Sequence, residues 1–155
     1  MRLEGKTAVV TGAGLTDSVG WGIAHVLARE GATVAVFDLN GAAAERTAGE
    51  LTELGREALA YTIDVVDYDA FDKALQDVVA KWGKLDILCN NAGIANNRTP
   101  IMTWETSEDE FDRIVAVNCK GTWNGCRAIV PYMMGKKYGK IVNTSSVVSK
   151  EAFAG

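Results

Sequence analysis

Four short polar motifs in this chain each follow an apolar run, and each carries residue types that can bind a ligand. They are Thr11-Gly12-Ala13-Gly14, Asp38, Asn90-Asn91-Ala92-Gly93 and Asn143-Thr144-Ser145-Ser146. Glycines permit a tight turn and a close approach of the backbone to phosphate oxygens. Carboxylates, amides and hydroxyls can hydrogen-bond a sugar or a reacting carbonyl oxygen. The order of the motifs predicts a dinucleotide site with part of a hydride-transfer centre.

The glycine-rich turn is longer than the usual dinucleotide fingerprint. Strict GxGxxG spacing from Gly12 and Gly14 would place a third glycine at Asp17, but the glycines recur instead at Gly20 and Gly22. The segment still suits a pyrophosphate, because the N-terminus of the following helix would offer free N–H groups and the positive end of its dipole. The alternative is an ordinary strand-to-helix turn that binds no ligand.

Asp38 ends the second apolar run, 26 residues after Gly12 and 18 after Gly20. An acid about 20 residues beyond the glycine turn can accept hydrogen bonds from the adenosine ribose. Its charge would also repel a 2′-phosphate, so Asp38 predicts NAD rather than NADP as the cofactor. The alternative is a loop or helix-capping aspartate.

The elements that must position these motifs can be predicted from five short apolar runs, which are typical of strands buried on both faces of a parallel sheet. These runs span residues 7–11, 33–37, 58–63, 85–89 and 140–144. Helices are expected between them, over residues 22–30, 42–54, 70–82 and 107–134, with Pro131 bending or ending the last one. The alternation predicts a single α/β domain over residues 1–155, a Rossmann-like doubly wound sheet in three αβα layers that stops after the fifth strand. The motifs then fall at the carboxyl edge of the sheet, where ligands bind.

Composition narrows the class of protein. The 155-residue chain has a net charge of -4 and a pI of about 5.0, which argues against a nucleic-acid partner. The three cysteines, Cys89, Cys119 and Cys126, are odd in number and lack CxxC spacing. They predict free thiols in a reducing cytoplasm and no metal site. No secretory signal or membrane span is expected, because no apolar run approaches the ~18 residues that a span needs.

Taken together, the motifs resemble the short-chain dehydrogenase/reductase family. The resemblance runs over the whole chain, which would correspond to roughly the N-terminal three-fifths of a typical member. It implies a set of cofactor-binding residues along the carboxyl edge of the sheet. Gly12, Gly20, Gly22 and Ile23 would line the pyrophosphate, with Ser18 in the same turn; Asp38 would hold the adenine ribose; Asp64 and Val65 would flank the adenine; and Asn91, Ala92 and Gly93 would run along the cofactor.

The resemblance also implies two residues of the catalytic centre. Asn118 would hold a water in a proton relay, and Ser146 would hydrogen-bond the substrate oxygen. The family's Tyr-x-x-x-Lys motif, which supplies the general acid, follows the serine by about a dozen residues, a position just past Gly155. Tyr132 to Lys136 fits that pattern by letter, but it is expected at the opposite edge of the sheet and is not that motif.

The predicted function is NAD-dependent hydride transfer between a nicotinamide cofactor and a small alcohol or carbonyl substrate. One alternative is a dinucleotide-binding module or fragment without catalysis. Another is a member like the enoyl-thioester reductases, whose glycine turn carries a serine, here Ser18, and a long spacer. A homo-oligomer is expected because the helix over residues 107–134 resembles the family's subunit-contact helix. A fifth strand left as an open edge could also make the chain unstable alone.

Overall fold

The computed structural model of the chain describes residues 1–95, 102–146 and 150. Its strands form one parallel sheet of five, in the order β3-β2-β1-β4-β5. The strands are β1 (Thr7–Thr11), β2 (Thr33–Asp38), β3 (Ala58–Thr62), β4 (Ile87–Asn90) and β5 (Lys140–Asn143). All five predicted strands are therefore present, and each bound lies within two residues of the expected one.

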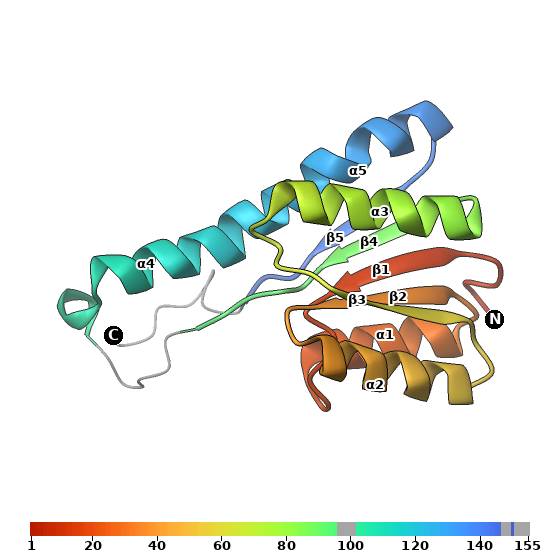
Figure 1. Ribbon diagram of the computed structural model, residues 1–155, viewed down its shortest axis with the longest axis horizontal. Helices are drawn as coiled ribbons and strands as arrows, with labels where there is room; N and C mark the ends of the chain where they lie inside the picture. The colour runs from red at the N-terminus through yellow and green to blue at the C-terminus, as the bar shows by residue number, and fades with distance from the viewer. Residues whose placement is uncertain (96–101, 147–149, 151–155) are drawn as a thin grey trace.

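Helices cover both faces of this sheet, which confirms the predicted three-layer, Rossmann-like α/β fold. Figure 1 shows α1 and α2 on one face and α3 and α5 on the other. The helical elements are α1 (Val19–Arg29), α2 (Gly41–Glu53), α3 (Tyr68–Trp82), the 3-10 turn η1 (Thr103–Glu105), α4 (Glu108–Val115), the π-helical segment η2 (Ala116–Gly121) and α5 (Thr122–Lys136). The last three follow one another without a break and extend past the carboxyl ends of the strands (Figure 1).

Polar side chains set where four of these helices begin. In each case the residue before the helix is extended, and its side-chain oxygen accepts the backbone N–H three residues on, which satisfies one of the free donors of the first turn. These N-caps are Ser18, Asn40, Asp67 and Ser107. Gly83 ends α3 in the left-handed conformation, with φ +75°. The local sequence therefore fixes the start of the helix that follows each of the first three strands.

Pro131 does not end the last helix. The sequence analysis expected this proline either to bend the helix or to end it, and the second of these expectations is wrong. Helix α5 runs on to Lys136, although proline removes one helical hydrogen bond. Ile129 and Met133, on either side of Pro131, are 2% and 7% exposed and pack in the core on the α3 face of the sheet. Burying two such side chains contributes about 1.5–3 kcal/mol each, enough to offset a proline cost of about 3 kcal/mol.

The core consists of two apolar clusters, one on each face of the sheet. Alternate residues of one strand belong to different clusters, as Val10 and Val9 of β1 and Val36 and Phe37 of β2 show. Since successive strand residues point to opposite faces and both faces are covered, both sets are buried. This double burial explains why the strands are continuous apolar runs in the sequence rather than alternating ones.

Candidate functional site

The centre of the sheet is the point where strand order changes direction. β1 pairs with β2 on one side and with β4 on the other, so the chain leaves β1 toward one edge and later returns beside it. In open parallel sheets, the crevice outside the carboxyl ends of the strands at such a switch point is the usual ligand site. The segments after β1 and β4 are therefore the first place to look for a site.

The hydroxyl of Thr11 joins these two segments. Its Oγ1 accepts the backbone N–H groups of Asn91 and Ala92, each at 2.9 Å. The Asn91 side-chain amide in turn donates to the carbonyl oxygens of Thr11 and Gly12 at 3.1 and 3.2 Å. The predicted Asn91 and Ala92 thus lie beside the glycine turn, and the Asn91 amide fixes that turn in place. Their contact with a cofactor stays a prediction.

Close backbone approach requires glycine at two positions of the predicted pyrophosphate loop. Gly12 has φ +65°, and a Cβ there would lie 2.7 Å from the Cα of Ala92. A Cβ on Gly20 would clash with the carbonyl oxygen of Gly12 and would lie 2.5 Å from Nδ2 of Asn91. Gly12 is therefore enclosed between the start of α1 and the loop after β4. The result is a tightly packed stretch of glycine backbone beside the N-terminus of α1, a combination that suits a pyrophosphate.

The residues that lengthen the turn form the cap of α1. Asp17 adopts the left-handed conformation, with φ +62°, and Ser18 follows as the N-cap, its Oγ accepting the Trp21 N–H at 3.2 Å. Ser18 thus sets the direction in which the helix N-terminus points. By contrast, a Cβ on Gly22 would have nothing within 4 Å, so packing does not require glycine there. The predicted contacts of Gly22 and Ile23 with the pyrophosphate stay predictions.

Asp38 lies half-buried at the end of β2, where backbone N–H groups hold its carboxylate. Its Oδ2 accepts the N–H of Gly14 at 2.8 Å and its Oδ1 that of Asn40 at 2.9 Å. A carboxylate has lone pairs left for a ribose hydroxyl. The Gly14 carbonyl oxygen accepts from Nη2 of Arg46 at 3.0 Å and from Oγ1 of Thr47 at 3.3 Å. Sequence reasoning missed Arg46, because nothing in the sequence distinguishes an exposed helical arginine.

The residues predicted beside an adenine follow β3. Asp64 is exposed, and its Oδ1 accepts the Val66 N–H at 2.9 Å. Val65 is buried against Gly121, where a Cβ would lie 2.6 Å from its Cγ2. The fully buried Asn124 of α5, which sequence reasoning also missed, donates to the carbonyl oxygens of Val65 and Val66 at 2.8 and 3.2 Å. This anchor fixes the loop at the carboxyl edge of the sheet.

Asn118 lies in the π-helical segment and holds the loop after β4. Its Oδ1 accepts the N–H of Ile94 and its Nδ2 donates to the Ile94 carbonyl oxygen, both at 2.8 Å. A Cβ on Gly93 would lie 3.4 Å from the same Oδ1. π-helical turns are frequent at functional sites. The structure thus brings the predicted Asn118 and Gly93 together, while the water that Asn118 is predicted to hold stays a prediction.

Strand β5 brings the fourth motif to the same edge. Asn143 pairs in register with Asn90, whose Nδ2 donates to the Asn143 Oδ1 at 2.9 Å. Thr144 donates its N–H to the Asn90 carbonyl oxygen at 2.9 Å and its hydroxyl to the Asn91 Oδ1 at 3.2 Å. Ser146 lies exposed two residues further along. Four of the five strand ends, those of β1, β2, β4 and β5, therefore carry the motifs with which the sequence analysis began.

Tyr132 and Lys136, which fit the Tyr-x-x-x-Lys pattern by letter, lie away from this edge. Helix α5 ends at Lys136 and the chain then enters β5 at Lys140, the amino end of that strand. Tyr132 faces α3, where it lines a hollow of about 120 Å³ with Leu75 and other residues, and its hydroxyl is buried. This placement agrees with the exclusion of Tyr132 as the acid–base group.

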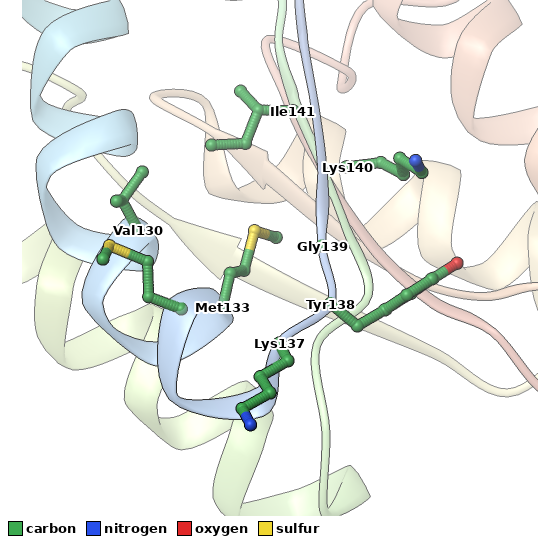
Figure 2. A pocket seen from close by; sticks show the side chains of 8 residues that line it. Val130, Met133, Lys137, Tyr138, Gly139, Lys140 and Ile141 are labelled. Carbon is green, nitrogen blue, oxygen red and sulfur yellow. The ribbon is translucent and has the colours of Figure 1, made fainter.

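A larger hollow, of about 540 Å³, also lies at the amino end of β5 rather than at the motifs. Figure 2 shows Val130 and Met133 of α5 beside Ile141 of β5 around it.

Among the described residues, no group of three or more His, Cys, Asp or Glu is arranged to bind a metal. None of the described helices combines the length and the apolar character that crossing a membrane requires.

Comparison with known proteins agrees with this arrangement. Residues 6–155 match the sequence model of the family described as short chain dehydrogenase. The chain belongs to that family. Over 148 residues it is 36% identical to 3-oxoacyl-[acyl-carrier-protein] reductase FabG of Thermotoga maritima, covering 96% of this chain and 58% of the relative. The predicted family membership is thus confirmed.

Two solved structures superpose closely on the chain. One is a NAD+-bound xylitol dehydrogenase, with a TM-score of 0.93, 32% identity, and coverage of 99% of this chain and 58% of that one. The other is a metagenomic short-chain oxidoreductase in complex with NADP, with a TM-score of 0.89, 32% identity, and coverage of 99% and 68%. The chain therefore spans somewhat more than half the length of the FabG and xylitol dehydrogenase relatives.

Proposed function

We propose that this chain forms the cofactor-binding part of a NAD-dependent oxidoreductase that interconverts an alcohol and a carbonyl. The observation that carries the proposal is the tightly packed glycine backbone at the switch point, where Gly12 and Gly20 leave no room for a side chain beside the N-terminus of α1. Glycine backbone beside a helix N-terminus suits a pyrophosphate. Asp38, fixed at the end of β2, supports NAD over NADP, since its charge disfavours a 2′-phosphate.

The bound cofactor would supply the hydride, and residues of the chain would orient the reactants. Ser146, beyond the carboxyl end of β5, would hydrogen-bond the substrate oxygen. Asn118, whose amide is fixed to Ile94, would present its segment of backbone and a water to a proton relay. Proton transfer itself needs a further group, and the family resemblance assigns it to a tyrosine that follows the serine. The small-molecule substrate is an alcohol or ketone of unassigned structure.

Titration with NADH, followed by cofactor fluorescence, tests this proposal. We expect micromolar binding of NADH, weaker binding of NADPH, and weaker NADH binding by Asp38→Ala. Glu53→Ala, which removes an exposed acid from the last turn of α2, is the matched control and should bind as the wild type does. Soluble, folded protein that binds neither dinucleotide would refute the proposal. Binding without turnover of any alcohol or ketone in a panel, measured on a chain extended through the expected Tyr-x-x-x-Lys motif, would favour a non-catalytic module.

The same family resemblance leads us to propose that the chain self-associates through α4 and α5. In support, α4 buries no residue of its own in this chain, and Phe111, Val115 and Trp123 are 61%, 42% and 54% exposed. Apolar faces of this kind favour association. Sedimentation should show a dimer or larger species that Phe111→Asp disrupts and Val26→Asp, on α1, does not. A wild-type chain that sediments as a monomer at all concentrations would contradict this proposal.

A further inference from the structure

A single amide side chain, that of Asn91, joins the glycine turn to the end of β5. Its Nδ2 donates to the carbonyl oxygens of Thr11 and Gly12 at 3.1 and 3.2 Å, and its Oδ1 accepts the hydroxyl of Thr144 at 3.2 Å. Both N–H groups of the amide and its oxygen therefore have a partner. The glycine turn and the strand end that leads to Ser146 are thus joined by two hydrogen bonds through one side chain.

The Asn91 amide has little room to move independently of the turn. A Cβ on Gly20 would lie 2.5 Å from its Nδ2, so the start of α1 packs closely against it. On the other side, the backbone of β5 holds Thr144, whose N–H donates to the Asn90 carbonyl oxygen at 2.9 Å. A displacement of the turn must therefore move the amide and alter its bond to the Thr144 hydroxyl.

We propose that Thr144 is a positioning residue, which transmits occupancy of the glycine turn to Ser146 through the Asn91 amide. When a pyrophosphate binds the turn, the carbonyl groups of Thr11 and Gly12 shift with their backbone, and the amide follows them. Linked hydrogen bonds also polarise one another, so a change at the amide N–H groups reaches the amide oxygen and the Thr144 hydroxyl. The inference rests on the proposed function, in which a dinucleotide binds the turn and Ser146 binds the substrate oxygen.

The competing explanation is that the Thr144 hydroxyl only satisfies the Asn91 oxygen at the edge of the sheet. ADP separates the two explanations, because it carries the adenosine and pyrophosphate of the cofactor but no nicotinamide. In the proposed site its pyrophosphate lies after β1, two strand spacings or about 10 Å from β5, and its adenosine lies farther away, toward β2 and β3. An effect of ADP on Ser146 must therefore pass through the protein.

The experiment titrates the isotope-labelled chain with ADP and follows backbone amide signals by NMR in the wild type, Thr144→Val and Thr144→Ser. In the wild type, saturating ADP should shift the Ser146 signal and leave that of Ile141, near the amino end of β5, in place. Valine keeps the branched shape but has no hydroxyl, so Thr144→Val should lose the Ser146 shift. Its ADP affinity should change less than about twofold, because one exposed neutral hydrogen bond contributes little net free energy. Serine keeps the hydroxyl, so Thr144→Ser should retain the shift.

Thr52→Val is the matched control. It removes a hydroxyl that bonds the Ala48 carbonyl oxygen inside α2, and it should leave the Ser146 shift as in the wild type. A shift that persists in Thr144→Val, is missing from Thr144→Ser or is absent from the wild type with ADP bound would overturn the inference. If Thr144→Val does not fold, Thr144→Ala removes the same hydroxyl and must meet the same expectation. A folded wild type that binds no ADP would instead refute the proposed function.

Discussion

Replacing Gly20 with alanine should destabilise the protein strongly, although alanine is the better helix former. The added Cβ would clash with the Gly12 carbonyl oxygen and would lie 2.8 Å from the Gly12 carbonyl carbon and 2.5 Å from Nδ2 of Asn91. Gly12 has little room to move, because it packs closely against Ala92: a Cβ on Gly12 would lie 2.7 Å from the Cα of Ala92. The substitution must therefore separate α1 from the turn or displace the Asn91 amide.

The size of the effect can be estimated from what is lost. Displacing the Asn91 amide breaks its hydrogen bonds to Thr11 and Gly12, at 3.1 and 3.2 Å, each worth about 1 kcal/mol net. Overpacking adds about 1–3 kcal/mol, and the higher helix propensity of alanine returns at most about 1 kcal/mol. We therefore expect the free energy of unfolding to fall by about 3 kcal/mol.

Denaturant unfolding measures this directly, and the chain offers a matched control. Gly49 lies inside α2, and a Cβ there would have nothing within 4 Å. Gly49→Ala should therefore raise the free energy of unfolding by about 0.5–1 kcal/mol. The reasoning is refuted if Gly20→Ala unfolds at the same denaturant concentration as the wild type, or if both substitutions shift the midpoint in the same direction.

Three further predictions concern residues near the site and on the α3 side of the sheet. Asn124→Ala should lower the free energy of unfolding by about 2 kcal/mol, because it leaves two carbonyl oxygens of the loop after β3 without their donor; an unchanged denaturant midpoint would contradict this. Burial raises the pKa of the Cys89 thiol to about 11, so a thiol reagent at neutral pH should label exposed Cys119 in the native state and Cys89 only after unfolding. The Tyr61 hydroxyl, 2.5 Å from Asp77, and then the Lys81 ammonium hold the pKa of the Asp77 carboxyl below its usual value of 3.8. Its contribution to stability is therefore present above that value and is lost as the pH falls through the folded pKa. Tyr61→Phe should raise the Asp77 pKa in a carboxyl NMR titration, and a pKa that stays where it is would show that the hydroxyl does not stabilise the carboxylate.

The fold could be predicted from the sequence because its signals are local. Each buried strand is an apolar run, and glycines or capping residues mark where the helices lie between strands. The end of the last helix was less predictable, since the penalty of Pro131 is local while the burial of Ile129 and Met133 depends on the sheet. No apolar run and no capping side chain marks the start of the π-helical turn at Asn118.

The sequence predicts where in the fold the site lies, but it does not predict which hydrogen bonds its residues make. Motifs at the ends of parallel strands must share an edge, which places Gly12, Asp38 and Asn91 together whatever their partners are. The sequence could not show that the Asn91 amide faces the turn, or that Arg46 and Asn124 reach the site from helices. Such contacts depend on how the helices pack and on side-chain conformation, neither of which follows from spacing along the chain.

The pairing of β1 with β4, together with the hydrogen bonds between Thr11 and the loop after β4, has a consequence for how the protein folds. Thr11 and Asn91 meet across 80 residues of chain, whereas β1 and β2, or β2 and β3, pair across a single helix. Pairing of distant parallel strands is slow, because a long loop must close before any contact forms. We therefore expect the first three strands to pair early and β4 to pair with β1 late. A ligand that contacts the loops after both β1 and β4 would bind only chains in which these strands have paired. It would therefore stabilise the product of this late step of folding.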